Sequence, residues 1–348
     1  VLGSSGGSVH FEGSVVGFAY LHNSSLQMSG TIGSNGGVLL TGSAGNVWFT
    51  PYNIKNTTVT VASTGGEMSL VYGGEYSALG ADFTVNGEID SSGHGRLQLT
   101  TDGTANFAGL PVVDGALDIV LSDAASPHIH FNGNLSGVYG KDSLSVEGDY
   151  YSETNFQLVS AAENLSLSFA NGFAVEQAVV EIRRSGFRTH FHYSGTLSIL
   201  GATFDVAGSM EPSYGGTLTL TVASDSDMPT FAGFEAEGTF TLKQPSDNSS
   251  DSGYVSFDGT LSGVPGMGES SLTVSGKRYA DGSFSLAGSA NGLTLAGYTI
   301  HSAYLTISSD TSETLITFGG SSRISALGAS FGISGSLDQD GTGILTLT

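Results

Sequence analysis

The sequence Val9-His10-Phe11-Glu12-Gly13 places an aliphatic residue, an aromatic residue and a glycine at alternate positions, and this pattern decides the fold. It recurs, with an aliphatic or aromatic residue first, at Leu70–Gly74, Ile129–Gly133, Phe191–Gly195, Val255–Gly259 and Ile316–Gly320. The six closing glycines are separated by 61, 59, 62, 64 and 61 residues. A period of this length is typical of proteins built as an array of structural repeats.

Three further patterns keep the same phase, and we name the four segments of each period D, A, B and C, with D carrying the aromatic residue. Segment A surrounds a glycine, at Gly30, Gly87, Gly148, Gly208, Gly276 and Gly335. Segment B is found at Val38–Thr41, Leu97–Thr100, Phe156–Leu158, Leu218–Thr221, Phe284–Leu286 and Leu345–Thr348. Segment C is found at Val59–Val61, Leu117–Leu121, Val180–Ile182, Phe240–Leu242 and Leu305–Ile307. Apolar and polar residues alternate in most segments, which predicts half-buried strands.

These patterns predict an all-β fold, an elongated tandem array of four-stranded repeats of about 61 residues, of β-solenoid or stacked β-sandwich type. One array is expected over residues 1–348, with repeats at 18–79, 80–137, 138–199, 200–263 and 264–324 and partial repeats at 1–17 and 325–348. The stretch Phe173–Arg184 also fits a short helix, but its register with the other repeats favours a strand. A string of separate sandwich modules and a six-bladed propeller are the alternatives, although propeller blades need inner strands that are apolar on both faces.

The aromatic residue and glycine of each D segment are the predicted structural core of the repeat. They are Phe11, Gly13, Tyr72, Gly74, Phe131, Gly133, Tyr193, Gly195, Phe257, Gly259, Phe318 and Gly320. The glycine lies two residues after the ring and on the same face, so we expect another backbone or a ring to approach it closely. A side chain at Gly133 or Gly195 should cost about 1–3 kcal/mol through overpacking.

The composition of the chain argues against several classes of function. The chain has 348 residues, with 32 acidic against 10 basic side chains and no cysteine. A net charge of −22 makes nucleic acid and anionic membranes unsuitable partners. The lack of cysteine excludes disulfides, cysteine-based zinc sites and thiol enzymes. The sequence has neither an apolar run long enough for a membrane helix nor a recognised catalytic or phosphate-binding motif, so no enzyme is expected.

Histidines give the strongest local signal for a ligand site. His128 and His130 alternate on one D segment, and His190 and His192 occupy the equivalent positions one repeat later. If adjacent repeats place these strands side by side, the four imidazoles form a candidate site for Zn²⁺, Ni²⁺ or Cu²⁺. The alternative is that these are tolerant outward positions, because Ser256 and Thr317 replace them in later copies.

Acidic turns make Ca²⁺ the one candidate cofactor. Asp338-Gln339-Asp340-Gly341 begins like an oxygen-ligand loop, and Asp225, Asp227, Asp247, Asp251 and Asp310 lie in similar polar stretches. The closing glutamate of a full calcium loop is missing, and Asp-Gly is also an ordinary hairpin turn, so solvated turns are the default.

Asn-x-Ser/Thr acceptors for N-linked glycans occur at Asn23, Asn56, Asn134, Asn164 and Asn248. Their number does not exceed what this Ser/Thr-rich composition gives by chance. It is nevertheless compatible with a glycoprotein at a cell surface.

The composition is similar in general style to repetitive extracellular proteins of microbial surfaces, although no diagnostic motif identifies a family. The expected function is a structural subunit of an extracellular filament, fibre or surface stalk, a homopolymer of copies joined end to end through repeat–repeat β contacts. The pattern starts in D and ends in B without a capping sequence, so we expect the chain to continue or to dock end to end. The alternatives are an adhesin or glycan-binding β module, and a β-groove that holds lipid.

Overall fold

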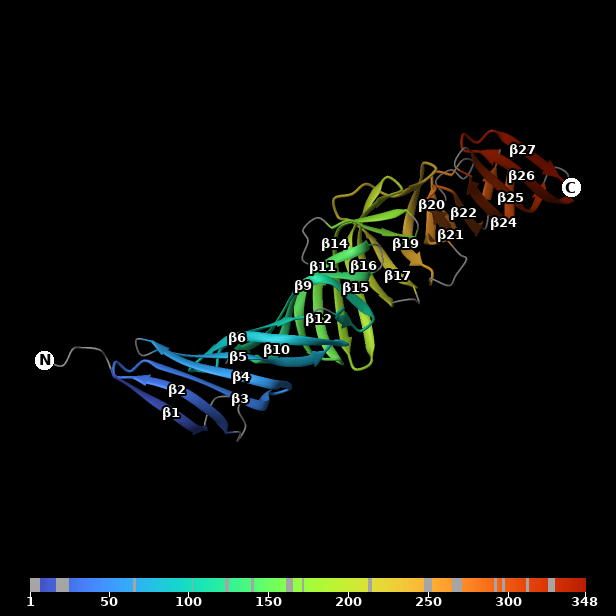
Figure 1. Cartoon of the computed structure of the whole chain (residues 1–348). Coiled ribbons are helices and arrows are strands. Elements are labelled where there is room, and N and C mark those ends of the chain that lie inside the picture. The colour runs from blue at the N-terminus through green and yellow to red at the C-terminus, as the bar shows by residue number, and fades with distance from the viewer. Residues whose placement is uncertain are drawn as a thin grey trace. The chain divides into compact units, whose positions relative to one another are not determined.

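The computed structural model describes residues 7–16, 25–64, 67–101, 103–122, 125–138, 141–160, 165–170, 172–211, 215–246, 252–264, 271–290, 293–295, 298–310, 313–324 and 329–348. Within these ranges the secondary structure consists of strands and turns, without a helix (Figure 1). The all-β prediction is confirmed. The ambiguous stretch after Gly172 is strand β14, as its register with the other repeats predicted.

The four predicted segments are strands in successive repeats. The D strands are β1 (Ser8–Val15), β5 (Glu67–Ala78), β10 (Ala125–Val138), β15 (Arg188–Ile199), β20 (Tyr254–Ser262) and β25 (Thr314–Ile324). The A strands are β2 (Leu26–Gly33), β6 (Ala81–Asp90), β11 (Lys141–Ser152), β16 (Ala202–Glu211), β21 (Leu272–Tyr279) and β26 (Ala329–Asp338). The B strands are β3 (Val38–Phe49), β7 (Gly95–Thr100), β12 (Asn155–Ser160), β17 (Gly215–Val222), β22 (Phe284–Ala290) and β27 (Gly343–Leu347). The C strands are β4 (Tyr52–Thr64), β9 (Leu110–Ser122), β14 (Phe173–Ser185), β19 (Phe234–Gln244) and β24 (Tyr298–Ser309).

A fifth, short strand precedes C in each repeat, and the sequence analysis missed it. We name it C′; its copies are β8 (Asn106–Phe107), β13 (Leu167–Phe169), β18 (Thr230–Phe231) and β23 (Leu293–Leu295). In the first repeat the end of β3 has this role, because Val47–Phe49 pairs with Tyr52–Ile54. In the C′–C turns, Ala108 and Gly109 both have positive φ, as do Ala232 and Gly233. This is the conformation that two-residue hairpin turns favour.

The ladders join each repeat to the next. Within a repeat, D pairs with A and A with B, and B pairs with C, as in β5–β6–β7–β9; every such pairing is antiparallel. The C strands β4, β9, β19 and β24 each then pair with the following D strand, namely β5, β10, β20 and β25. Separate blades or sandwich modules would interrupt hydrogen bonding at these junctions. Both the propeller and the module alternatives are therefore wrong, and the tandem array is confirmed.

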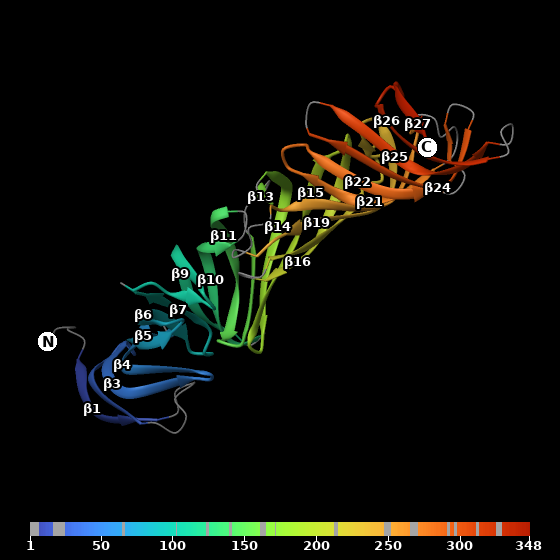
Figure 2. The same cartoon turned by 90° about the vertical axis from the view of Figure 1, so that its right-hand side faces the viewer.

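The chain forms two compact units. The first consists of Val1–Ala162 with Glu181–Thr189, and the second of Glu163–Val180 with His190–Thr348. In the second unit the meander runs from β16 through β27, and Figure 2 shows β24, β25 and β26 side by side as their ladders require. Two of the boundaries between the units fall within β14 and β15.

Alternation along each strand creates one apolar face, and this face forms the core of each unit. In β17, Leu218 and Leu220 are buried whereas the threonines between and beside them are exposed. The core joins strands far apart in sequence: in the first unit the Tyr52 hydroxyl donates to the Tyr150 carbonyl at 3.0 Å, across 98 residues. The sheet of that unit is thus curved enough for β4 and β11 to meet over a shared interior.

Aromatic rings make the same contact at successive junctions. The C′ aromatic residue packs against the D aromatic residue that follows it, with ring centroids 5.4, 4.9, 5.3 and 5.3 Å apart in Phe49–Tyr72, Phe107–Phe131, Phe169–Tyr193 and Phe231–Phe257. Such pairs stabilise beyond the area that they bury. One repeat therefore supplies the ring that covers the next.

A glycine recurs at the same position of every A strand, and the steric reason is the same in all six copies. The A glycine lies directly opposite the D aromatic residue, as in Phe131↔Gly148 and Tyr193↔Gly208. A Cβ at Gly208 would lie 2.6 Å from the Thr217 carbonyl oxygen and 2.9 Å from the Leu218 Cα on the neighbouring B strand. The equivalent B-strand carbonyl blocks the other five A glycines, so the matched glycines share one environment.

Candidate functional site

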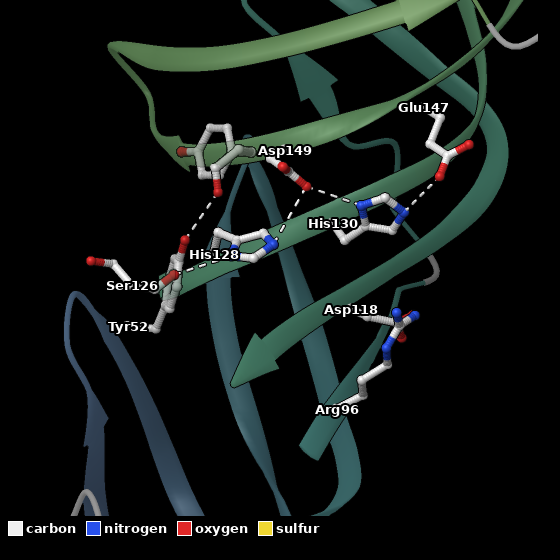
Figure 3. Close-up of polar contacts among 9 residues, drawn as sticks. Tyr52, Arg96, Asp118, Ser126, His128, His130, Glu147 and Asp149 are labelled. Atoms are coloured by element: carbon white, nitrogen blue, oxygen red, sulfur yellow. Dashed lines mark hydrogen bonds and ion pairs between the residues drawn. The ribbon is translucent and has the colours of Figure 1, made fainter. Parts of the chain in front are cut away.

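A cluster of polar side chains in the first unit lies on the outer face of β10 and β11 (Figure 3). His128 and His130 are two residues apart, so strand geometry directs both imidazoles to one face. Asp149 is the cross-strand partner of His130, and its Oδ1 lies 3.0 Å from His130 Nδ1 and 3.5 Å from His128 Nε2. Glu147 Oε1 lies 3.3 Å from His130 Nε2. Two imidazoles thus share one carboxylate oxygen.

Exposure limits what this cluster contributes. The side chains of His128 and His130 are 13% and 25% exposed, but Asp149 and Glu147 are 38% and 53% exposed. Ion pairs at such a surface stabilise by about 0–1 kcal/mol. The network is suited to holding β10 and β11 in register, with the His128 ring also tilted against Tyr151 at 5.5 Å.

The four-histidine metal site gains no support from this geometry and stays a prediction. His128 and His130 have carboxylate partners in the first unit, whereas His190 and His192 belong to the second. His192 Nδ1 forms a hydrogen bond of 2.8 Å with the Ser209 hydroxyl. Among the residues that the structure describes, no group of three or more metal-binding side chains is arranged to hold an ion.

The acidic stretch at Asp338 is a hairpin turn between β26 and β27. Asp338 Oδ1 accepts hydrogen bonds from the backbone N–H of Asp340 at 3.0 Å and of Thr342 at 2.8 Å. Asp90 caps the β6–β7 turn in the same way, and the backbone N–H of His94 holds the pKa of that carboxyl below its usual value. The two carboxylates are engaged in ordering their own loops, which matches the solvated-turn interpretation. Of the other acidic positions, Asp247 and Asp251 lie outside the described residues.

Two of the five glycosylation acceptors can be placed. Asn56 is exposed at an irregularity between β4 and β5, and its side-chain amide donates to Glu75 at 2.8 Å. Asn134 is half-buried on β10 and donates to Asp114 at 2.7 Å. Asn23, Asn164 and Asn248 lie outside the described residues.

An open hollow of about 360 Å³ in the first unit mixes apolar and polar groups. It is lined by Leu79, Ala108, Tyr150, Glu153, Phe156 and Arg184. Burial raises the pKa of the Tyr150 phenol well above its ordinary value, which keeps that group neutral. A single carboxylate and a single guanidinium beside a neutral phenol do not form a nucleophile–base pair, so the hollow does not indicate catalysis.

The open edge of β1 differs from the equivalent edge of the later D strands. Among described residues β1 pairs with β2 alone, whereas β5, β10, β20 and β25 each have a C strand on the other side. Phe11 is half-buried, but the later D rings are at most 3% exposed. The sequence grouped Phe11 with the other five rings and gave no signal for this difference, which follows from the strands that pair with each D strand among the described residues.

Strand β27 in the second unit also has one edge with which no described strand pairs. It is a B strand, and B strands such as β17 and β22 pair with C on the side away from A, whereas β27 pairs with β26 alone among described strands. Leu347 is 40% exposed, and its counterpart Leu220 is 4% exposed. Among the described strands, no C strand therefore pairs with either of these two edges.

Among the residues that the structure describes, no helix has the length and apolar character needed to cross a membrane. Comparison of the chain with protein-family models, with curated proteins and with solved structures finds no match. Function must therefore be inferred from the architecture and its surfaces.

Proposed function

We propose that this protein is a structural subunit of an extracellular filament, fibre or surface stalk, and that it acts mechanically, not as an enzyme. Its units would join through the same β contacts that join one repeat to the next. A head-to-tail contact that extends a sheet in one direction produces open filaments where the rotation between units does not close a ring.

One observation supports this proposal above the others: the C strand of one repeat pairs with the D strand of the next, and the same ring pair covers the junction. At the junction of β19 and β20, nine consecutive residue pairs from Glu235↔Ser262 to Lys243↔Tyr254 form the ladder. The Phe231 and Phe257 rings lie 5.3 Å apart beside it. Tension along such a ladder would be shared among many backbone hydrogen bonds.

The outer surface suits a hydrated fibre. Exposed Ser and Thr side chains pair across strands, as in Thr41–Thr60 at 3.3 Å. The net charge of −22 opposes lateral contact between fibres. An extracellular location and attached glycans belong to this proposal, since acceptors such as Asn56 are exposed.

Electron microscopy of the protein in its native material tests the proposal. We expect long fibres whose axial repeat is a multiple of the repeat spacing. Discrete closed particles under the same conditions would show that the protein is not a filament subunit.

The alternative, an adhesin or glycan-binding module, remains a prediction. It would use exposed aromatic side chains, such as Trp48 at 46% and Tyr304 at 63% exposure, as sugar platforms. Binding of the purified chain to a glycan array, abolished by Trp48→Ala or Tyr304→Ala, would favour it over a purely mechanical role.

A further inference from the structure

Three hairpin turns surround the hollow of about 360 Å³ in the first unit, and its volume falls within the range of about 300–1,000 Å³ that is usual for small-molecule sites. The turns are closed by the pairs Ala78↔Ala81, Phe107↔Leu110 and Ser152↔Asn155. The backbone N–H of Asn106 donates to the Leu79 carbonyl at 2.8 Å, which ties the first two turns together. Arg184, near the end of β14, completes the lining.

The buried part of the lining is apolar. Leu79, Tyr150 and Phe156 line the hollow and are 5%, 4% and 2% exposed. The Tyr150 and Phe156 rings are stacked on each other, with centroids 6.3 Å apart. Because so little of either ring is exposed, neither offers an open face on which a sugar ring could stack. This part of the hollow is suited instead to a compact aliphatic group.

Two charged side chains of opposite sign complete the lining without forming an ion pair. Arg184 is half-buried and makes two long hydrogen bonds, from Nε to the Gly186 carbonyl at 3.4 Å and from a terminal nitrogen to the Thr189 hydroxyl at 3.5 Å. Glu153 is exposed in the turn between β11 and β12. Within the described part of the chain, neither residue has an oppositely charged partner. Both therefore keep hydrogen-bonding capacity for a ligand.

Both charges act on one phenol. Burial is the largest reason why the pKa of the Tyr150 phenol is raised; the carboxylate of Glu153 adds to the rise and the guanidinium of Arg184 opposes it. Since such interactions weaken with distance, the two charged groups lie on either side of a hydroxyl that stays neutral and can donate a hydrogen bond. The hollow thus presents a cation, an anion and a neutral donor beside an apolar surface.

We propose that this hollow binds a free α-amino acid with an aliphatic side chain, in its zwitterionic form. The ligand carboxylate would pair with Arg184 and accept a hydrogen bond from the Tyr150 hydroxyl. Its ammonium would pair with Glu153, and its side chain would lie against Leu79 and Phe156. A ligand with only one of the two charges would leave Glu153 or Arg184 unpaired. This inference is independent of the proposed function, because it concerns a small ligand and not the contacts between repeats.

Three probes with one aliphatic skeleton test the proposal on the full chain. L-Leucine carries both charges, isocaproate lacks the ammonium, and isopentylamine lacks the carboxylate. Saturation-transfer NMR titrations measure the binding of each probe. We expect leucine to bind saturably, and each single-charge analogue to bind at least about tenfold more weakly.

Two variants remove one charge each from the hollow. Arg184→Gln and Glu153→Gln should both weaken leucine binding at least about tenfold. In addition, Glu153→Gln should bind isocaproate at least as tightly as leucine, because the carboxylate that repels a monoanion is gone. A purely structural role for Glu153 would not produce this reversal.

The matched controls carry the same changes outside the hollow. Arg183 is the exposed neighbour of Arg184 on β14, and Glu88 is exposed on β6. Arg183→Gln and Glu88→Gln should bind leucine as the unaltered chain does. Thermal unfolding of all four variants checks that each is folded.

Three results would overturn the inference. They are the absence of a saturable leucine signal with the unaltered chain, equal binding of leucine and its single-charge analogues, and undiminished leucine binding by folded Arg184→Gln and Glu153→Gln chains. If Arg184→Gln does not fold, the analogue series on the unaltered chain still decides the matter. Electron microscopy decides the proposed function separately.

Discussion

At the scale of single residues, a tyrosine occupies a position where most copies have phenylalanine. Tyr72 is 1% exposed, and its hydroxyl has no hydrogen-bond partner among the described residues. Phe131, Phe257 and Phe318 fill the equivalent place without a polar atom. A buried hydroxyl that forms no hydrogen bond is destabilising, because it has exchanged water for an apolar surrounding.

Tyr72→Phe should therefore raise the free energy of unfolding by about 1 kcal/mol. Denaturant unfolding measures the change through its midpoint. Tyr52→Phe is the matched control, because the Tyr52 hydroxyl donates to the Tyr150 carbonyl at 3.0 Å. It should lower stability by about 1 kcal/mol. Equal effects of the two substitutions would show that the hydroxyl of Tyr72 is satisfied in solution.

Two tyrosine phenols, those of Tyr72 and Tyr76, predict that the folded protein loses stability at alkaline pH. Burial raises the pKa of both Tyr72 and Tyr76 to about 12, from the ordinary value of 10.0. Between these values the unfolded chain loses phenolic protons that the folded chain keeps. Stability is therefore fully present below pH 10 and is lost as the pH rises towards 12.

Unfolding midpoints measured across this range should fall with pH, and Tyr72→Phe should make the fall shallower. A pH-independent midpoint up to pH 12 would contradict the raised pKa values.

The glycines of the D strands give a steric prediction. Gly133→Ala should destabilise by about 1–3 kcal/mol, because its Cβ would collide with the backbone of β9. Gly45 on β3 has open space around its Cβ position, so Gly45→Ala should be neutral or slightly stabilising. Thermal unfolding of the two variants separates a steric effect from the general preference against glycine in strands.

At the scale of elements, the short C′ strand contributes an aromatic ring to the core. Phe107 is fully buried and contacts rings on three strands, namely Phe131, Tyr150 and Phe156. Phe107→Ala should cost about 3–5 kcal/mol. Phe187 lies in the same unit and is 90% exposed, so Phe187→Ala should change stability by less than about 0.5 kcal/mol. A small effect at Phe107 would mean that the interior is loosely packed.

The D, A, B and C strands could be predicted because each has period-2 alternation and a phase shared with its copies. C′ could not be found by alternation, since two or three residues are too few to show a period. Its signal was local: Phe-Ala-Gly occurs at Phe107–Gly109 and again at Phe231–Gly233, each at the positive-φ turn. The approach of Asp149 to two histidines also lay beyond sequence reasoning, because strand register decides it.

At the scale of the whole molecule, charge governs solubility. The chain carries 32 acidic and 10 basic side chains and has a sequence pI of about 4.3. Lowering the pH towards this value removes the self-repulsion that keeps copies apart. Light scattering should show association rising steeply near pH 4.3 and reversing on return to neutral pH. Association that is strongest at neutral pH and low salt would contradict a charge-limited surface.

Because nearly every ladder joins strands that are neighbours along the polypeptide, the ring pair and glycine at one junction do not depend on how many junctions precede it. A duplication or deletion of one whole period in the coding sequence would leave the ladder, the ring pair and the glycine of the other junctions in place, although contacts that span more than one period, such as Tyr52–Tyr150, would change. Such a protein can change its length over evolutionary time by simple recombination, because the contacts within each remaining junction are kept.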